Sequence, residues 1–88
     1  MRYITHIRLS GGDRLEHITR VRWVDGLSFR QGESSREEMV RWIDDGGDAR
    51  VKASPRDVSV HVVRASPPYL RTAPNDSPYD NLLTLPRF

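Results

Sequence analysis

Residues 3–12, Tyr3-Ile-Thr-His-Ile-Arg-Leu-Ser-Gly-Gly12, are echoed by residues 17–26, His17-Ile-Thr-Arg-Val-Arg-Trp-Val-Asp-Gly26, and this pair decides the fold. Both copies alternate in polarity and are rich in β-branched and aromatic residues, which is the pattern of a β-strand. Gly11, Gly12 and Asp13 lie between them as turn formers. The repeat therefore predicts a β-hairpin of two similar strands.

The alternation separates the hairpin into two faces. Ile7 and Val21 fall on one face together with Trp23, and we expect this face to be buried. The opposite face carries His6 and three arginines: Arg8, Arg20 and Arg22. We therefore expect an apolar core face and a cationic outer face.

The remaining elements follow from changes in the hydrophobic period. Leu27–Arg30 alternates and could form a third short strand that ends at Gln31. Ser35 and Glu38 make a capping box that starts a short helix, and Gly46 and Gly47 supply its left-handed end. Two further strands are expected at residues 49–53 and 58–64, with Pro55 and Asp57 in the turn between them.

These elements predict an α+β fold, with an antiparallel sheet of four to five strands and one helix packed on one face. We expect residues 1–66 to form a single domain, followed by an ordered, extended C-terminal tail over residues 67–88 that docks on it. Proline, asparagine, aspartate and serine recur in the tail and oppose regular structure there.

The tail combines a loop composition with large apolar side chains, which disordered segments lack. They are Tyr69, Leu70, Tyr79, Leu82, Leu83, Leu85 and Phe88. One interpretation is that they close the open side of a sheet that one helix cannot cover. The other is that Leu82, Leu83, Leu85 and Phe88 form a docking peptide for another protein.

The same ending carries a resemblance to a known family. Tyr69-Leu-Arg-Thr72, Asn75-Asp76, Asp80-Asn-Leu82 and Leu85-Pro-Arg-Phe88 resemble the closing pattern of small bacterial and phage proteins that share a domain of unknown function. The resemblance extends over nearly the whole chain. It implies no activity, cofactor or catalytic residue.

Composition narrows the classes of function. The chain has 88 residues, no cysteine and a net charge of +2, so it must fold by packing alone, and a reducing cytoplasm is the expected compartment. No segment approaches the roughly 18 apolar residues that a membrane span needs. Among the basic residues only Lys52 is a lysine, and arginine suits bidentate contacts with carboxylate or phosphate.

Catalytic and metal motifs are not predicted. The sequence lacks a serine-elbow pattern and a cysteine nucleophile, and its paired carboxylates flank the helix, where capping explains them. His6, His17 and His61 are not spaced as metal ligands. We therefore expect no enzyme activity, no cofactor and no metal.

Two functions remain, and both are binding functions. The first is a non-enzymatic binding or adaptor protein that acts on a protein partner, through the apolar tail residues or the arginine face. The alternative is a nucleic-acid-associated regulator or phage counter-defence protein that uses Arg8, Arg20 and Arg22. Binders of single-stranded nucleic acid also place aromatic rings on the cationic face, and the pattern puts Trp23 and Tyr3 on the opposite one.

Overall fold

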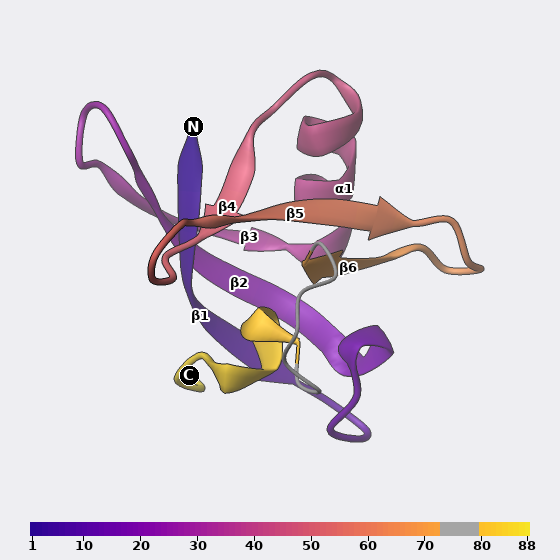
Figure 1. The fold of residues 1–88 in the computed structure, drawn as a ribbon. Helices are drawn as coiled ribbons and strands as arrows, with labels where there is room; N and C mark the ends of the chain where they lie inside the picture. The colour runs from indigo at the N-terminus through magenta and orange to yellow at the C-terminus, as the bar shows by residue number, and fades with distance from the viewer. Residues whose placement is uncertain (73–79) are drawn as a thin grey trace.

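The computed structural model describes residues 1–72 and 80–88 and shows one α-helix and one curled sheet, which confirms the α+β class (Figure 1). The predicted tail includes residues 73–79, among them Tyr79 and Asn75-Asp76, which lie outside the described residues. The elements are β1 (Arg2–Leu9), η1 (Leu15–His17), β2 (Ile18–Asp25), β3 (Gln31–Ser35), α1 (Arg36–Asp44), β4 (Ala49–Val51), β5 (Val58–Val63), β6 (Tyr69–Thr72) and η2 (Asn81–Thr84), where η denotes a short 3₁₀ helix.

The sheet has six strands in the order β3-β2-β1-β4-β5-β6, so the expected four to five antiparallel strands were too few and the sheet is mixed. β1 and β4 run parallel, while the other neighbours are antiparallel. The parallel pair arises because α1 carries the chain from β3 across β2 and β1, and such a crossover returns the next strand in the same direction. The sixth strand, Tyr69–Thr72, pairs with β5 although the sequence placed it in the tail.

Two irregularities in the β1–β2 ladder alter the predicted faces. The pairing shifts between Ile4 and His6 and again between Arg8 and Leu9. An extra residue in one strand of a pair moves the following side chains to the other face. As a result Ile4 and Ile18, which simple alternation places with the arginines, are buried in the core with Ile7. Arg8, Arg20 and Arg22 remain on the outer face.

The helix begins and ends as predicted. The Ser35 hydroxyl accepts a hydrogen bond from the Glu38 amide at 3.1 Å, and the Glu38 carboxylate accepts one from the Ser35 amide at 2.9 Å. Gly46 has a φ of 101°, the left-handed conformation that ends a helix. Met39 of α1 is fully buried against the sheet.

The third strand was expected at residues 27–30 but lies at Gln31–Ser35. Residues 27–30 form the turn between β2 and β3, and β3 starts at Gln31. Its cross-strand partners run from Val24↔Gln31 to Arg20↔Ser35 without a register shift. β3 is the first strand in the sheet order and therefore an edge strand.

The C-terminal segment pairs with the second half of β1, around Ile7. β4 pairs with β1 at Arg2 and Tyr3, which leaves the far half of that edge open. There the Ile7 amide donates to the carbonyl of Pro86 at 3.0 Å, and the Phe88 amide donates to the carbonyl of Ile7 at 3.2 Å. Figure 1 shows this yellow segment beside β1 at the lower end of the molecule.

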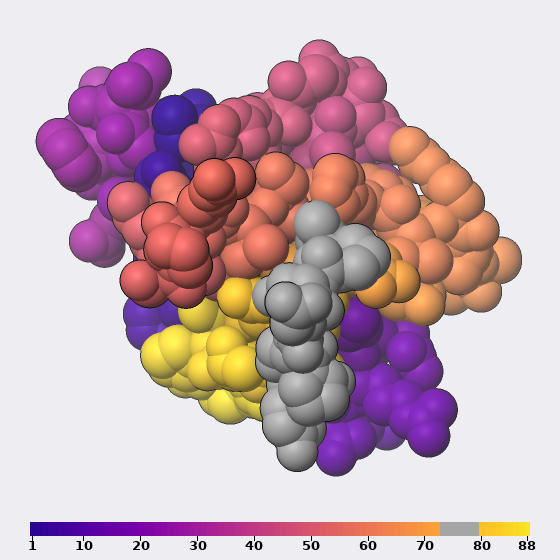
Figure 2. All heavy atoms as spheres, viewed as in Figure 1, coloured from indigo at the N-terminus to yellow at the C-terminus, as the bar shows by residue number. Residues whose placement is uncertain are grey.

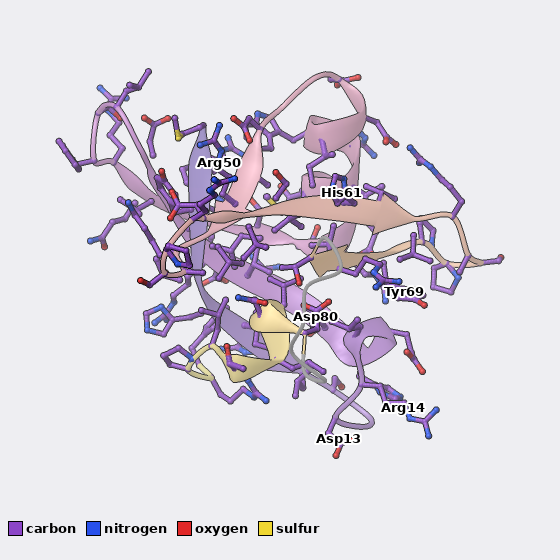
Figure 3. All side chains as sticks on the ribbon, viewed as in Figure 1. Asp13, Arg14, Arg50, His61, Tyr69 and Asp80 are labelled. Carbon is purple, nitrogen blue, oxygen red and sulfur yellow. The ribbon has the colours of Figure 1, made fainter. Side chains whose placement is uncertain are left out.

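Leu82 of η2 completes the core and is fully buried with Ile4, Ile7 and Leu70. Asp80 fixes the entry to η2, because its two carboxylate oxygens accept from the amides of Thr72 at 3.0 Å and Leu82 at 2.9 Å. Figure 3 shows Asp80 between η2 and the end of β6. The described tail residues therefore contribute to the core.

A guanidinium joins the helix to the sheet. The carbon at the centre of the Arg2 guanidinium lies 3.9 Å from the ring centroid of Trp23 on β2 and 4.2 Å from that of Trp42 on α1. Burial lowers the pKa of Arg2, with a smaller opposing effect from the Asp25 carboxylate. Cation–π contacts of this kind stabilise a cation that has lost part of its water.

Candidate binding surfaces

The β2–β3 turn, residues Gly26–Arg30, presents two large apolar side chains to solvent. Leu27 is 79 % exposed and Phe29 is 78 % exposed. Among the described residues the only other exposed large apolar side chain is that of Met1, at 36 %. We call residues 26–30 the hairpin tip. Figure 2 shows it at the upper left edge of the molecule, next to the N-terminal residues.

The hairpin tip is held by hydrogen bonds at its base. One Asp25 carboxylate oxygen accepts from the amides of Leu27 at 2.8 Å and Ser28 at 2.9 Å. The Asp25 amide donates to the Arg30 carbonyl at 2.7 Å, and the Gly26 amide donates to the Met1 carbonyl at 2.9 Å. The amide donors of Ser28 and Leu27 lower the pKa of Asp25, since they stabilise its charged form.

Phe29 also has an unusual backbone. Its φ is 60°, and among the described residues it is the only one other than glycine with a positive φ. This left-handed conformation costs a residue with a Cβ roughly 1–2 kcal/mol. The Phe29 ring is exposed, so no burial of apolar surface within the chain offsets this cost.

The arginine face, Arg8, Arg20 and Arg22, is brought together as the sequence predicted, but acceptors already contact its members. Nε of Arg20 lies 2.7 Å from a Glu33 carboxylate oxygen, and Nε of Arg22 lies 3.6 Å from the other. The pKa of Glu33 is lowered, chiefly by the hydrogen bond from Arg20. Nε of Arg8 donates to the Phe88 carbonyl at 3.0 Å.

An aromatic ring does lie on the arginine face, although the alternation of the strands predicted none there. It belongs to Phe88 of the tail. Arg8 and Arg22 lie over the Phe88 ring at 4.6 Å and 4.3 Å from its centroid, and the His6 ring meets it edge to face at 6.5 Å. A shallow hollow of about 310 Å³ adjoins this cluster, lined by side chains that include His6, Arg22, Val24 and Gln31.

The other predicted tail residues differ in exposure. Leu82 is fully buried, so its side chain does not reach the surface of this fold. Leu83, Leu85 and Phe88 are half-buried, and the two leucines pack against the core.

The sequence interpretation missed Leu27 and Phe29 as surface residues, because their alternation with Ser28 resembles a strand. A signal for the turn was present. Asp25-Gly26 is a dipeptide that favours tight hairpin turns, and it directly precedes them.

No group of three or more histidine, cysteine, aspartate or glutamate side chains is placed to hold a metal ion within residues 1–72 and 80–88. The three histidines lie on separate elements: His6 on β1, His17 in η1 and His61 on β5. No helix in that part of the chain is long and apolar enough to cross a membrane.

A family model described as a protein of unknown function, DUF3892, matches residues 3–86. The chain belongs to this family. The DUF3892 match covers α1, η2 and the six strands except Arg2 at the start of β1, and it stops before Arg87 and Phe88. Searches of curated proteins and of solved structures returned no match.

Proposed function

We propose that this DUF3892 protein is a non-enzymatic binding module that acts in the cytoplasm on a protein partner, with the hairpin tip as its anchor. The observation that supports the proposal is Phe29, which is 78 % exposed at a φ of 60°. The backbone of Phe29 serves the turn, since its amide donates to the Asp25 carbonyl at 3.0 Å, whereas its exposed ring adds nothing to the core. Strained residues gather at binding sites, where the rest of the fold holds them.

The geometry of the hairpin tip suits an anchor. Aromatic side chains dominate the binding energy of many protein interfaces, and they act best when they are already held in the bound conformation. The Asp25 carboxylate holds the tip backbone through two amides, so Leu27 and Phe29 are presented on a fixed turn. The half-buried tail residues Leu83, Leu85 and Phe88 lie on another part of the surface and would add contacts only to a large partner.

Affinity capture from the native host, followed by quantitative mass spectrometry, tests the proposal. Four baits are compared: wild type, Leu27→Ser, Phe29→Asn and Ser28→Ala. Asparagine tolerates the left-handed conformation, so Phe29→Asn removes the ring and keeps the turn. Ser28→Ala is the matched control, because it alters the same exposed turn without removing an apolar anchor.

The expected result is a protein that the wild type and Ser28→Ala retain and that Leu27→Ser and Phe29→Asn lose. Purified partner should then bind the purified wild-type chain directly. An identical set of retained proteins for wild type and Phe29→Asn would contradict the proposal.

A second candidate function is that of a nucleic-acid-associated regulator, for example a phage counter-defence protein, and the observation that favours it is the position of Phe88. Its ring lies among Arg8, Arg22 and His6, and single-strand binders use this combination of aromatic and cationic groups. The carboxylate of Glu33 opposes it by neutralising part of the same face.

A mobility-shift assay separates the two candidates. If the arginine face binds nucleic acid, Arg20→Glu with Arg22→Glu should abolish a shift that weakens steeply with salt. Arg14→Glu with Arg56→Glu, two exposed residues elsewhere, is the control with equal charge change. The absence of any shift at low salt would rule this second candidate out.

A further inference from the structure

β3 presents a free strand edge next to the hairpin tip. It is the terminal strand of the sheet order, and within the described residues no other strand pairs with its outer side. Natural proteins usually protect such an edge with a proline, a charged side chain, a bulge or a covering segment. β3 contains no proline or lysine, and its pairing with β2 is regular. Its one charged side chain, Glu33, contacts Arg20 and Arg22 of the neighbouring strand.

The other sheet edge is treated differently. Pro67 and Pro68 precede β6, and the Thr72 amide of β6 is taken by the Asp80 carboxylate at 3.0 Å. The segment that contains η2 packs against β6. One end of the sheet is thus covered, and the β3 end is left open.

The outward groups of β3 follow from the ladder. The Asp25 amide donates to the Arg30 carbonyl, so these two residues form a hydrogen-bonded pair. In an antiparallel ladder such pairs alternate with pairs whose backbone groups point away from each other. The pairs Val24↔Gln31 and Arg22↔Glu33 are of the second kind. Gln31 and Glu33 therefore direct their amide and carbonyl groups toward solvent.

The net charge around this edge is positive. Asp25 is occupied by the turn amides, and the single charge of Glu33 is shared between Arg20 and Arg22. Arg30 is exposed and forms no ion pair within residues 1–72 and 80–88. The Arg22 side chain is 51 % exposed. An acidic segment complements this surface.

A second copy of the chain carries the same positive net charge, and one of its possible pairing registers also opposes two glutamates. If two β3 strands paired about a two-fold axis at Glu33, the two Glu33 side chains would face each other on the same side of the sheet. Directly opposed like charges destabilise a strand pair. The Arg30 side chains would also add positive charge to an already cationic surface.

We propose that the β3 edge and the hairpin tip together bind an extended, acidic segment of the partner protein, which adds to the sheet as a seventh strand. Gln31 and Glu33 supply the backbone hydrogen bonds, Leu27 and Phe29 receive an apolar side chain, and Arg30 and Arg22 attract the acidic ones. Strand addition of this kind takes its affinity from the main chain and its specificity from alternate side chains. The proposal rests on the proposed function, of which it names the binding mode.

The test is a selection of random displayed peptides on the purified full-length chain, followed by nuclear magnetic resonance with the enriched peptides. We expect enriched sequences in which apolar residues alternate with aspartate or glutamate. Bound peptide should protect the amides of Gln31 and Glu33 from hydrogen exchange. Arg30→Gln should weaken binding and reduce its dependence on salt.

Gln31→Pro blocks the edge selectively. The Gln31 amide points away from β2, so proline there removes an outward donor and leaves the β2–β3 ladder intact. We expect Gln31→Pro to weaken peptide binding roughly tenfold or more, as loss of an edge hydrogen bond and a steric clash imply. Gln31→Thr, which keeps the amide and favours a strand, is the matched control and should bind as wild type.

Several outcomes overturn the inference. Basic, proline-rich or helical peptides would mean that the recognised chemistry is different, and the same holds if no peptide is enriched. Unchanged binding by a folded Gln31→Pro variant would mean that the edge is not used. If that variant does not fold, the amide protection in the wild-type chain decides the matter alone.

Protection of Gln31 and Glu33 without peptide, in a chain that self-associates, would assign the edge to a second copy. If capture of a whole protein still depends on Phe29 while the β3 amides stay unprotected, the proposed function stands and only this binding mode fails.

Discussion

Two apolar segments of this chain begin alike and end in opposite environments. An aspartate stands directly before the hairpin tip and another at the start of segment 80–88, and each accepts from the amide of a leucine two residues later, Asp25 from Leu27 and Asp80 from Leu82. Leu82 is fully buried, whereas Leu27 is 79 % exposed. The same local motif therefore serves the core in one place and presents a surface in the other.

The difference comes from what each segment meets. The C-terminal segment lies along the half of β1 that β4 leaves unpaired, so its leucine enters a core that the sheet and α1 leave open. The hairpin tip lies at the edge of the molecule (Figure 2), where Leu27 and Phe29 stay exposed. Hydrophobicity alone does not distinguish the two, because burial depends on which part of the sheet lies beneath.

Removal of residues 80–88 should have the largest effect. The deletion uncovers Ile7, removes Leu82 from the core and leaves the β1 edge without its partner. We expect the melting temperature to fall by about 10 °C or more, or the chain to lose its cooperative transition. Thermal unfolding followed by circular dichroism measures this. An unchanged melting temperature would show that the segment is dispensable for folding, and would return it to the role of a docking peptide.

A matched pair of leucine substitutions sharpens the comparison. Leu82→Ala should lower the free energy of unfolding by about 2–5 kcal/mol, since it leaves a cavity in the core. Leu27→Ala removes the same atoms from an exposed side chain and should change it by about 0.5 kcal/mol or less. Urea denaturation gives both values. Similar losses for the two variants would mean that the hairpin tip is packed in solution.

The two capping aspartates form a second matched pair. Asp80→Ala leaves the amides of Thr72 and Leu82 without acceptors in a partly buried place, and should cost about 1–3 kcal/mol. Asp25→Ala frees two amides that water can reach, so its cost should be smaller. Denaturation of both variants in one buffer tests the order, and a larger loss for Asp25→Ala would reverse the comparison.

Phe29→Asn should cost no stability. Asparagine tolerates a φ of 60° better than phenylalanine, and no buried contact is lost, so the free energy of unfolding should stay the same or rise by up to about 1 kcal/mol. The variant should nevertheless lose its partner. A destabilised Phe29→Asn would show that the ring serves folding.

Acid should loosen the hairpin tip, because Asp25 then loses the charge that holds the turn amides. The folded pKa of Asp25 lies below its ordinary value of 3.8. A depressed carboxylate pKa means that the contribution to stability is present above the ordinary value and is lost as the pH falls through the folded value. Faster hydrogen exchange at the Leu27 and Ser28 amides below about pH 4, corrected for intrinsic rates, would show this. Uniform protection down to global unfolding would argue against a separate opening of the tip.

Local signals in the sequence predicted local structure well. The Ser35 capping box, the Gly46 helix end and the strand at residues 58–63 are all present, because each depends on neighbours in the chain. The predicted arginine face also forms. Alternation placed its members correctly because the two ladder irregularities fall to either side of the Arg22 and Arg20 pairings.

Features that depend on distant contacts were missed. The parallel pairing of β1 with β4 is set by where α1 crosses the sheet, and no residue in either strand specifies it. The ladder shifts that bury Ile4 and Ile18 become visible only when both strands are paired. Whether Leu27 or Leu82 is covered likewise depends on elements more than 20 residues away in the chain.

The stacking of Arg2 between Trp23 and Trp42 has a practical consequence for spectroscopy. These are the two tryptophans of the chain, one on the sheet and one on the helix, and both indoles contact the same guanidinium. Their fluorescence therefore reports on the docking of α1 against β1 and β2, without an added label. A change in emission on partner binding would show that events at the hairpin tip reach the junction of helix and sheet.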